Sequence, residues 1–331
     1  MPLLLENRAA TLSPLPLITT EEARMTRVSL SSSTWLRVRK GIYTNRGSYA
    51  SAKPWIRYQV RVHAFARQHP DAILCLESAA VIHGIPLFGE TRDIHVYSPD
   101  RKRARRFGDV VVHTGVDLRT LVRVNGVLAT SLLDTAVDLS RVLPAAHALT
   151  VVDSVISPTQ GGPLTIDELN DHATSQCNRR GTARLRWVFG RADGLSESPG
   201  ESVSRAVIGW CGFEEPELQH EFHYSEKPAR SDFYFPSNRA IGESDGWQKY
   251  LLEDPGKAAE ALADEKRRED LLRSKGHPFA RWDLSAATRV DPLAAALTNI
   301  GVRRIGPAQT QMLDTLKDRS RQMPFKRRPA P

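Results

Sequence analysis

The sequence predicts an α/β protein built of several domains. Its 331 residues suffice for two or three modest hydrophobic cores. Helical and strand-like patterns alternate along the chain, and a polar turn cluster at 193–199 (DGLSESP) marks a domain boundary. Beyond it the order is helix, three strands, helix, strand, helix, which a mixed sheet flanked by helices would close.

Composition limits the class of protein further. No apolar stretch approaches the roughly 18 residues that a membrane span needs, so we expect no membrane partner. Cys75, Cys177 and Cys211 lie far apart, which favours neither a disulfide framework nor a zinc site. The N-terminus lacks the basic and apolar regions of a secretory signal, and we expect a cytoplasmic protein.

The net charge of +8 is concentrated in two places. The run 101–106 (RKRARR) holds five basic residues, and the tail 317–331 holds six basic residues against one aspartate. Such patches attract phosphate backbones, although a single basic run is more often a solvated loop. The Pro-rich polar tail is expected to be mostly disordered.

The first 50 residues predict a small winged-helix-like domain. Residues 19–22 (TTEE) carry a hydroxyl cap followed by acids and begin a short helix. Residues 36–43 predict a hairpin, or wing, on which Arg37, Arg39 and Lys40 could hold phosphates. The serine-rich segment 28–34 stands where a recognition helix would lie.

Residues 51–192 predict an α+β and helical domain. Pro54 opens a helix that runs to about residue 68, and residues 76–84 (LESAAVIHG) predict a short helix stopped by glycine. Strand-like runs at 93–97 and 109–113 flank the basic run, which we therefore place on a hairpin tip. The remaining helices are expected at 130–142, at 144–156 and after the capping box of Thr165 and Glu168.

Residues 193–305 form the third domain, and 306–331 the basic tail. Helices are expected at 202–212, 256–275 and 292–301, and strands at 218–224, 231–235, 239–244 and 279–282. Within the long helix, the run 265–270 (EKRRED) favours a solvated face with i,i+4 pairs. A DNA-facing role for Lys266 or Arg267 is the alternative.

Four acidic residues of the third domain could form a site. Glu201 begins a helix, Asp232 lies near the start of a strand, and Glu243 and Asp245 project from one face of the next strand. Clustered carboxylates suit Mg²⁺ or Mn²⁺, with Asp232 and Glu243 as ligands. Such an ion could activate water at a phosphodiester, and Lys249 could stabilise the developing charge. A solvated strand end, with Glu201 favouring the helix dipole, is the simpler alternative.

The motifs around these acids resemble those of a known superfamily. Glu201 in SPGES, Asp232 in SDF and Glu243 are similar to the acids of the PD-(D/E)XK nucleases, near the very-short-patch repair endonuclease fold. The resemblance implies a restriction-endonuclease-like α/β sandwich with a metal-dependent catalytic site. Asp245 stands where the superfamily pattern has lysine, which leaves Lys249 as a relocated lysine.

The N-terminal half resembles a different family. The segments RKGIY (39–43) and LESAAVIHG (76–84) are similar to AbiEi-type antitoxins of bacterial type IV toxin–antitoxin systems. The resemblance implies a transcriptional regulator that binds operator DNA, with a toxin gene product as a possible partner.

The leading hypothesis is therefore an antitoxin-like, DNA-binding regulator of a toxin–antitoxin or defence operon. The residues expected to contact double-stranded DNA are Arg37, Arg39, Lys40, Arg101, Lys102, Arg103, Arg105 and Arg106. An endonuclease that depends on Mg²⁺ or Mn²⁺ is the alternative. A nuclease fold without activity, which only grips DNA or a protein, is the third possibility.

Overall fold

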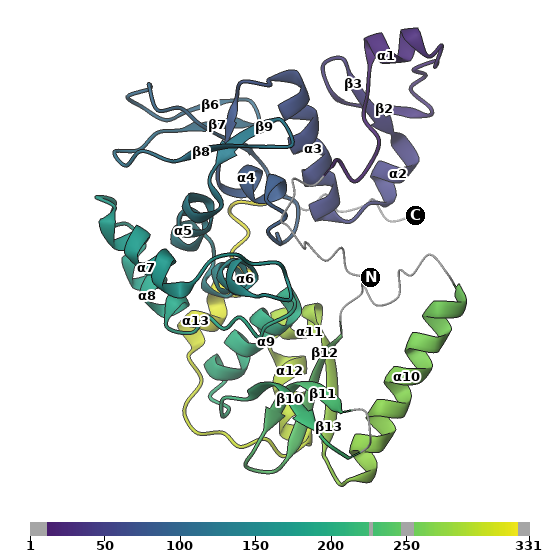
Figure 1. Cartoon of the computed structure of the whole chain (residues 1–331), viewed down its shortest axis with the longest axis vertical. Coiled ribbons are helices and arrows are strands. Elements are labelled where there is room, and N and C mark those ends of the chain that lie inside the picture. The colour runs from purple at the N-terminus through teal and green to yellow at the C-terminus, as the bar shows by residue number, and fades with distance from the viewer. Residues whose placement is uncertain (1–11, 225–227, 246–254, 324–331) are drawn as a thin grey trace. The chain divides into compact units, whose positions relative to one another are not determined.

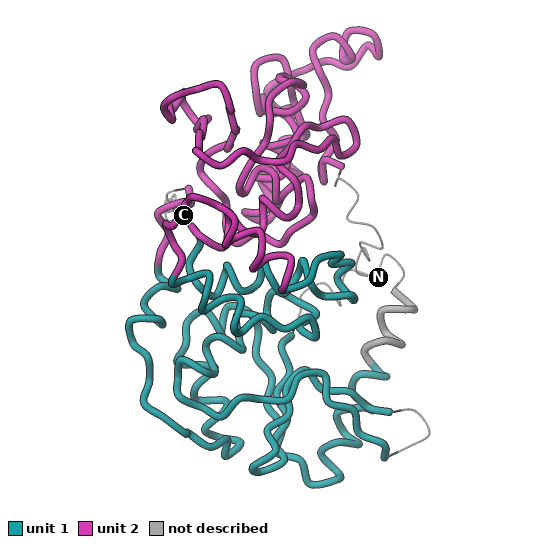
Figure 2. The backbone as a smooth tube through the Cα atoms, turned by 60° about the vertical axis from the view of Figure 1, so that its left-hand side comes forward, with its two compact units in different colours: residues 1–7, 143–166, 183–317 teal, residues 8–142, 167–182, 318–331 magenta. Residues whose placement is uncertain are grey.

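The computed structural model describes residues 12–224, 228–245 and 255–323, with the backbone alone over 255–262. The chain divides into two compact units (Figure 2). Unit 1 comprises residues 1–7, 143–166 and 183–317, and unit 2 comprises 8–142, 167–182 and 318–331. The expected boundary at 193–199 lies inside unit 1, where the helix over 145–156 packs against the helix over 199–210.

Unit 2 begins with a three-stranded antiparallel sheet of order β1-β3-β2. Its elements are β1 (Ile18–Thr19), α1 (Thr20–Met25), β2 (Trp35–Arg39), β3 (Ile42–Asn45) and α2 (Arg46–Ser51). A capping box between Thr19 and Glu22 starts α1, and Gly41 at φ +74° turns the β2–β3 hairpin, both as expected.

The expected recognition helix at 28–34 is absent. That segment consists of turns and irregular backbone. Its serines bond locally: the Ser31 hydroxyl lies 3.1 Å from that of Ser33, and the Ser31 carbonyl accepts from the Trp35 amide. Such local bonds compete with helix formation, so this part of unit 2 has the expected β2–β3 hairpin but lacks the expected helix before it.

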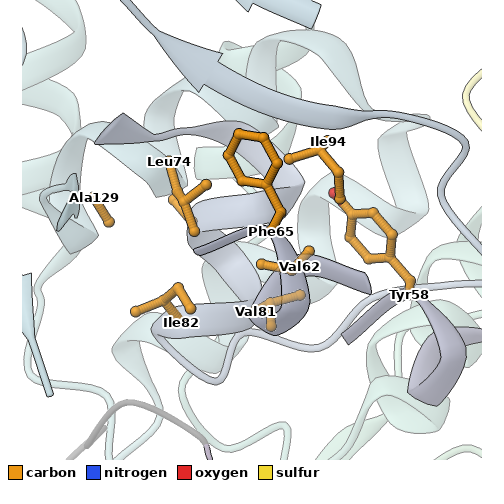
Figure 3. Close-up of a cluster of buried hydrophobic side chains, with 9 residues drawn as sticks. Tyr58, Val62, Phe65, Leu74, Val81, Ile82, Ile94 and Ala129 are labelled. Carbon is orange, nitrogen blue, oxygen red and sulfur yellow. The ribbon is translucent and has the colours of Figure 1, made fainter. Parts of the chain in front are cut away.

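A six-stranded sheet of order β6-β7-β5-β4-β9-β8 forms the rest of unit 2 (Figure 1). Its elements are α3 (Pro54–Gln68), β4 (Ile73–Leu74), α4 (Leu76–Ile82), β5 (Ile94–Tyr97), β6 (Arg105–Phe107), β7 (Val110–His113), β8 (Leu121–Val124), β9 (Val127–Thr130), α5 (Leu132–Val142) and α7 (Ile166–Ser175). Apolar side chains of α3 and α4 pack with those of the sheet in the core shown in Figure 3, which includes Tyr58, Phe65, Leu74 and Ile82.

The basic run does not lie on a hairpin tip. β5 and β7 pair in parallel, with Ile94 opposite Val110, so no hairpin joins them directly. β6 adds to β7 in antiparallel fashion and forms one edge of the sheet. Arg105 and Arg106 therefore belong to an edge strand, and only residues 101–104 precede it as a loop.

Unit 1 contains the expected α-β-β-β-α-β order. Its elements are α6 (Ala145–Ile156), α8 (Thr182–Phe189), α9 (Pro199–Trp210), β10 (Glu217–Phe222), β11 (Ala229–Phe235), β12 (Ala240–Asp245), α10 (Pro255–Ser274), β13 (Phe279–Asp283), α11 (Leu284–Arg289), α12 (Asp291–Asn299) and α13 (Thr310–Asp314). The sheet order is β10-β11-β12-β13, antiparallel except for the parallel pair β12–β13 that α10 connects. The chain is thus a mixed α/β protein with several sheets.

The tail differs from the expected disorder as far as residue 323. Arg321 donates from both Nε and Nη2 to the carboxylate of Glu77, with the Nη2 contact at 2.6 Å. Gln322 bridges to Thr91, and the Met323 amide donates to the Glu90 carbonyl. The buried Glu77 needs a counter-charge, and the basic tail supplies it. Across the described part of the chain, none of the helices is long and apolar enough to cross a membrane.

Candidate functional site

Asp232 and Glu243 lie on neighbouring antiparallel strands of unit 1. The register places Phe233 opposite Gly242, so the next residues along the two strands are Asp232 on β11 and Glu243 on β12. The Asp232 carboxylate accepts a hydrogen bond of 2.7 Å from the Ser244 amide. Glu243 is 2% exposed. The two carboxylates predicted as metal ligands are therefore brought together.

An arginine holds the buried carboxylate of Glu243. Arg268 of α10 donates from Nη1 to Oε1 at 2.9 Å and from Nη2 to Oε2 at 3.0 Å, a bidentate pair. The same Nη2 donates to Glu265 at 2.6 Å. Burial, the nearby Asp232 and Glu265 together raise the pKa of Glu243 to about 7, against the opposing effect of Arg268.

A second arginine holds the neighbouring acids. Arg281 of β13 contacts Asp245 at 3.1 Å, Glu265 at 2.6 Å and Glu269 at 3.0 Å. Asp245 lies opposite Asp283 in the parallel register of β12 and β13. Lys249, the expected catalytic lysine, lies outside the described residues.

Glu201 lies buried near the start of α9. Its Oε2 accepts hydrogen bonds of 2.9 Å from the Glu197 amide and from Nε2 of Gln219. Burial raises the pKa of its carboxyl group. A Cβ on the preceding Gly200 would lie 2.5 Å from Oγ of Ser244, so glycine lets this end of α9 approach β12 beside Glu243 and Asp245.

Arg268 and Arg281 were not predicted from the sequence as parts of this cluster. The solvated face expected for 265–270 holds for Arg267, whose side chain is 72% exposed, but the Arg268 side chain is only 19% exposed. The i,i+3 spacing of Glu265 and Arg268 was the available signal, since both point to one side of α10 and meet.

The described residues contain no group of three or more His, Cys, Asp or Glu side chains arranged to hold a metal ion. Both oxygens of Glu243 are bonded to Arg268. In this arrangement Asp232 and Glu243 do not fit Mg²⁺ or Mn²⁺, which prefer several oxygen ligands with open positions.

The basic residues expected to contact DNA fall into two groups. Arg39 pairs with Asp109 at 2.6 Å and lies over the Phe65 ring, and Arg106 donates two bonds of 2.7 Å to Asp93, so both are engaged within unit 2. Arg101 stacks on Phe107. The exposed members that form no ion pair among the described residues are Arg37, Lys40, Arg101, Lys102, Arg103 and Arg105.

The chain is a mixed α/β protein with two charged sites. In unit 1, an acidic cluster of Asp232, Glu243, Asp245, Glu265 and Glu269 surrounds Arg268 and Arg281. In unit 2, the exposed residues Lys102, Arg103 and Arg105 form a basic edge. The chain is 31% identical over 223 residues to two Mycobacterium tuberculosis proteins, Rv2248 of strain H37Rv and MT2308 of strain CDC 1551, both named only as uncharacterized proteins. The match covers 67% of this chain and 78% of each relative. The protein belongs to the family of these mycobacterial proteins. No family model and no solved structure matches the chain.

Proposed function

We propose that the protein is a DNA-binding, antitoxin-like transcriptional regulator whose α-β-β-β-α-β unit is a nuclease-like fold that does not cut. The observation that supports DNA binding is the exposed basic edge formed by Lys102, Arg103 and Arg105. These three cations form no ion pair with the described residues and lie beside one edge of the six-stranded sheet. Duplex DNA is the partner whose dense negative charge suits such a surface.

Salt dependence is the test of this binding. Each phosphate contact contributes about −0.9 to the slope of log binding constant against log salt concentration. The loss of three contacts should therefore reduce the magnitude of this slope by roughly 2.7. The variant is Lys102→Gln, Arg103→Gln, Arg105→Gln, measured by fluorescence anisotropy on duplex DNA. A control that removes the same charge from exposed sites elsewhere is Arg123→Gln, Arg179→Gln, Arg186→Gln.

Equal weakening by the two triple variants would contradict the proposal, because binding would then follow net charge alone. Binding of the wild type that is indifferent to salt would contradict it as well. We expect weaker DNA binding and a flatter salt dependence only in the variant of Lys102, Arg103 and Arg105.

The non-cutting part rests on Arg268. A guanidinium group that forks both oxygens of Glu243 neutralises the carboxylate that the nuclease resemblance assigns to the metal. Arg281 pairs with one carboxylate oxygen of Asp245 and one of Glu265. The cluster can then hold strands β12 and β13 and helix α10 together without any ion.

The second candidate function is a metal-dependent endonuclease, favoured by the adjacent placement of Asp232 and Glu243 on paired strands. Two carboxylates at one place repel unless a cation lies between them. Arg268 would have to leave Glu243 for this function. Phosphodiester cleavage with Mg²⁺ or Mn²⁺ that is abolished by Asp232→Ala, with the fold retained, would establish it.

The partners proposed for the regulator are its own operator DNA and a toxin gene product. The resemblance of the segments 39–43 and 76–84 to AbiEi-type antitoxins supports both. Footprinting on the promoter of its own operon tests the first, and co-purification with the product of an adjacent toxin gene tests the second.

A further inference from the structure

A cavity of about 260 Å³ lies within unit 2, and its lining includes no residue of the basic edge or of the acidic cluster. Its walls come from five separated segments: the start of α4, the end of β5, the end of β7 with the loop after it, the end of β9 with helix α5, and the chain just after α7. The lining residues that matter chemically are Tyr97, His113, Arg119, Asp138, Arg141 and Arg180. The volume lies just below the roughly 300–1,000 Å³ typical of small-molecule sites.

The charge of this lining is positive. Arg119 donates two hydrogen bonds of 2.8 Å to Asp138, the one carboxylate among the lining residues. Arg141 is 6% exposed and donates hydrogen bonds to the carbonyls of Arg180 and Ala173 and to the side-chain amide oxygen of Gln176. The three arginines and one aspartate of the lining sum to a formal charge of +2. Two further carboxylates act on Arg119 from just outside the lining, Asp134 at 3.8 Å from its Nε and Asp117. Arg180 forms no ion pair with the described residues, and its charge favours an anionic ligand.

A chain of buried side chains fixes His113 at the cavity. Glu77 lies 3.4 Å from Nε2 of His95, and Nδ1 of His95 lies 2.8 Å from Nε2 of His113. Arg321 in turn holds Glu77. Nδ1 of His113 makes no hydrogen bond to any described residue, so it remains for a ligand. Burial lowers the pKa of His113 to about 4, which keeps the ring neutral at pH 7.

Two further features suggest a site built for a ligand. Tyr97 is 6% exposed, and its buried hydroxyl has no hydrogen-bond partner in the described part of the chain. Unsatisfied buried polar groups are rare and need a partner such as a ligand or a water. Leu76, also in the lining, has φ +49°, a strained value for a leucine, and such strain gathers at functional sites.

We propose that this cavity binds a small organic phosphate, no larger than a nucleoside monophosphate. Arginines supply the planar donors that match phosphate oxygens, and the exposed Arg180 lies among the lining residues as the cation with most freedom to contact them. His113 and Tyr97 supply hydrogen bonds to the uncharged part. Leu76 and Val142 supply apolar walls.

The experiment is calorimetric titration of the full chain at low salt. The probes are ribose 5-phosphate and the four common nucleoside monophosphates, with the uncharged nucleosides as matched controls. We expect saturable binding of at least one phosphate-bearing probe, at least tenfold tighter than the matched uncharged compound. Absence of binding by every probe, or equal binding of nucleoside and nucleotide, would overturn the proposal.

Two variants locate the site. Val142→Trp fills the cavity from a position that is 40% exposed, and Arg180→Gln removes a lining charge. Both variants should lower the affinity for the phosphate-bearing probe at least tenfold. Arg179→Gln, at an exposed neighbour outside the lining, should leave that affinity unchanged. Circular dichroism checks the fold of each variant. Unchanged affinity in Arg180→Gln would place any binding elsewhere and contradict the proposal.

Discussion

The acidic cluster of unit 1 and the basic edge of unit 2 differ in whether their charges are paired within the protein. In unit 1, Glu243 is buried and each of its oxygens meets an arginine nitrogen. At the edge of unit 2, Lys102, Arg103 and Arg105 are exposed and form no ion pair with the described residues. A buried charge that is paired within the protein stabilises the fold, whereas an exposed charge without an ion pair is available to a binding partner. This contrast supports the proposals that the basic edge binds DNA and that the acids stabilise the fold.

Removing Arg268 should produce the largest loss of stability. Arg268→Ala leaves Glu243 buried without its partner, and breaking such a pair costs about 3 kcal/mol. Arg267→Ala removes a neighbouring charge whose pair with Asp264 is exposed, and should stay within about 0.5 kcal/mol. Urea unfolding at pH 7 measures both. Equal effects would mean that Glu243 does not depend on Arg268.

A buried carboxylate paired with an arginine should also make the stability of unit 2 depend on pH. Burial favours the neutral form of Glu77, but His95 and Arg321 outweigh it and lower the pKa to about 2 from 4.5. A carboxyl group with a lowered pKa stabilises the fold above its ordinary pKa and loses that contribution as pH falls towards 2. The difference amounts to about 3 kcal/mol.

The measurement is the urea midpoint of the wild type and of Glu77→Gln from pH 7 to pH 2. The variant should be less stable at pH 7, and its midpoint should fall less between pH 4.5 and pH 2. Parallel curves for the two proteins would show that Glu77 does not carry this dependence.

The smallest effect is expected at the edge of the acidic cluster. Asp245 is 34% exposed, and its partner Arg281 also contacts Glu265 and Glu269. Asp245→Asn should therefore cost about 0.5–1 kcal/mol, the value of a solvent-screened pair. Urea unfolding beside Arg268→Ala tests the ranking, and a larger loss in Asp245→Asn would contradict the view that burial decides the strength of these pairs.

Local patterns predicted most of the elements. Pro54 at the first helical position and the capping box at Thr19 placed α3 and α1, because these signals depend only on neighbouring residues. The parallel pairing of β5 with β7 depends on the whole sheet and was missed. The helix expected at 28–34 failed because hydroxyl groups there bond locally.

The site was predicted less completely than the fold. The strand pattern brought Asp232 and Glu243 together, since register follows from alternation. It could not show that Arg268, 25 residues further on, would occupy both oxygens of Glu243, because that depends on which face of α10 packs on the sheet. The cavity of unit 2 was missed for the same reason, since its walls come from five distant segments.

Calorimetric titration of Mn²⁺ into the wild type tests most directly the claim that Arg268 neutralises the acidic cluster in place of a metal. We expect no saturable binding at micromolar to millimolar Mn²⁺. Saturable binding that disappears in the double variant Asp232→Ala, Glu243→Ala would contradict it and would favour the endonuclease.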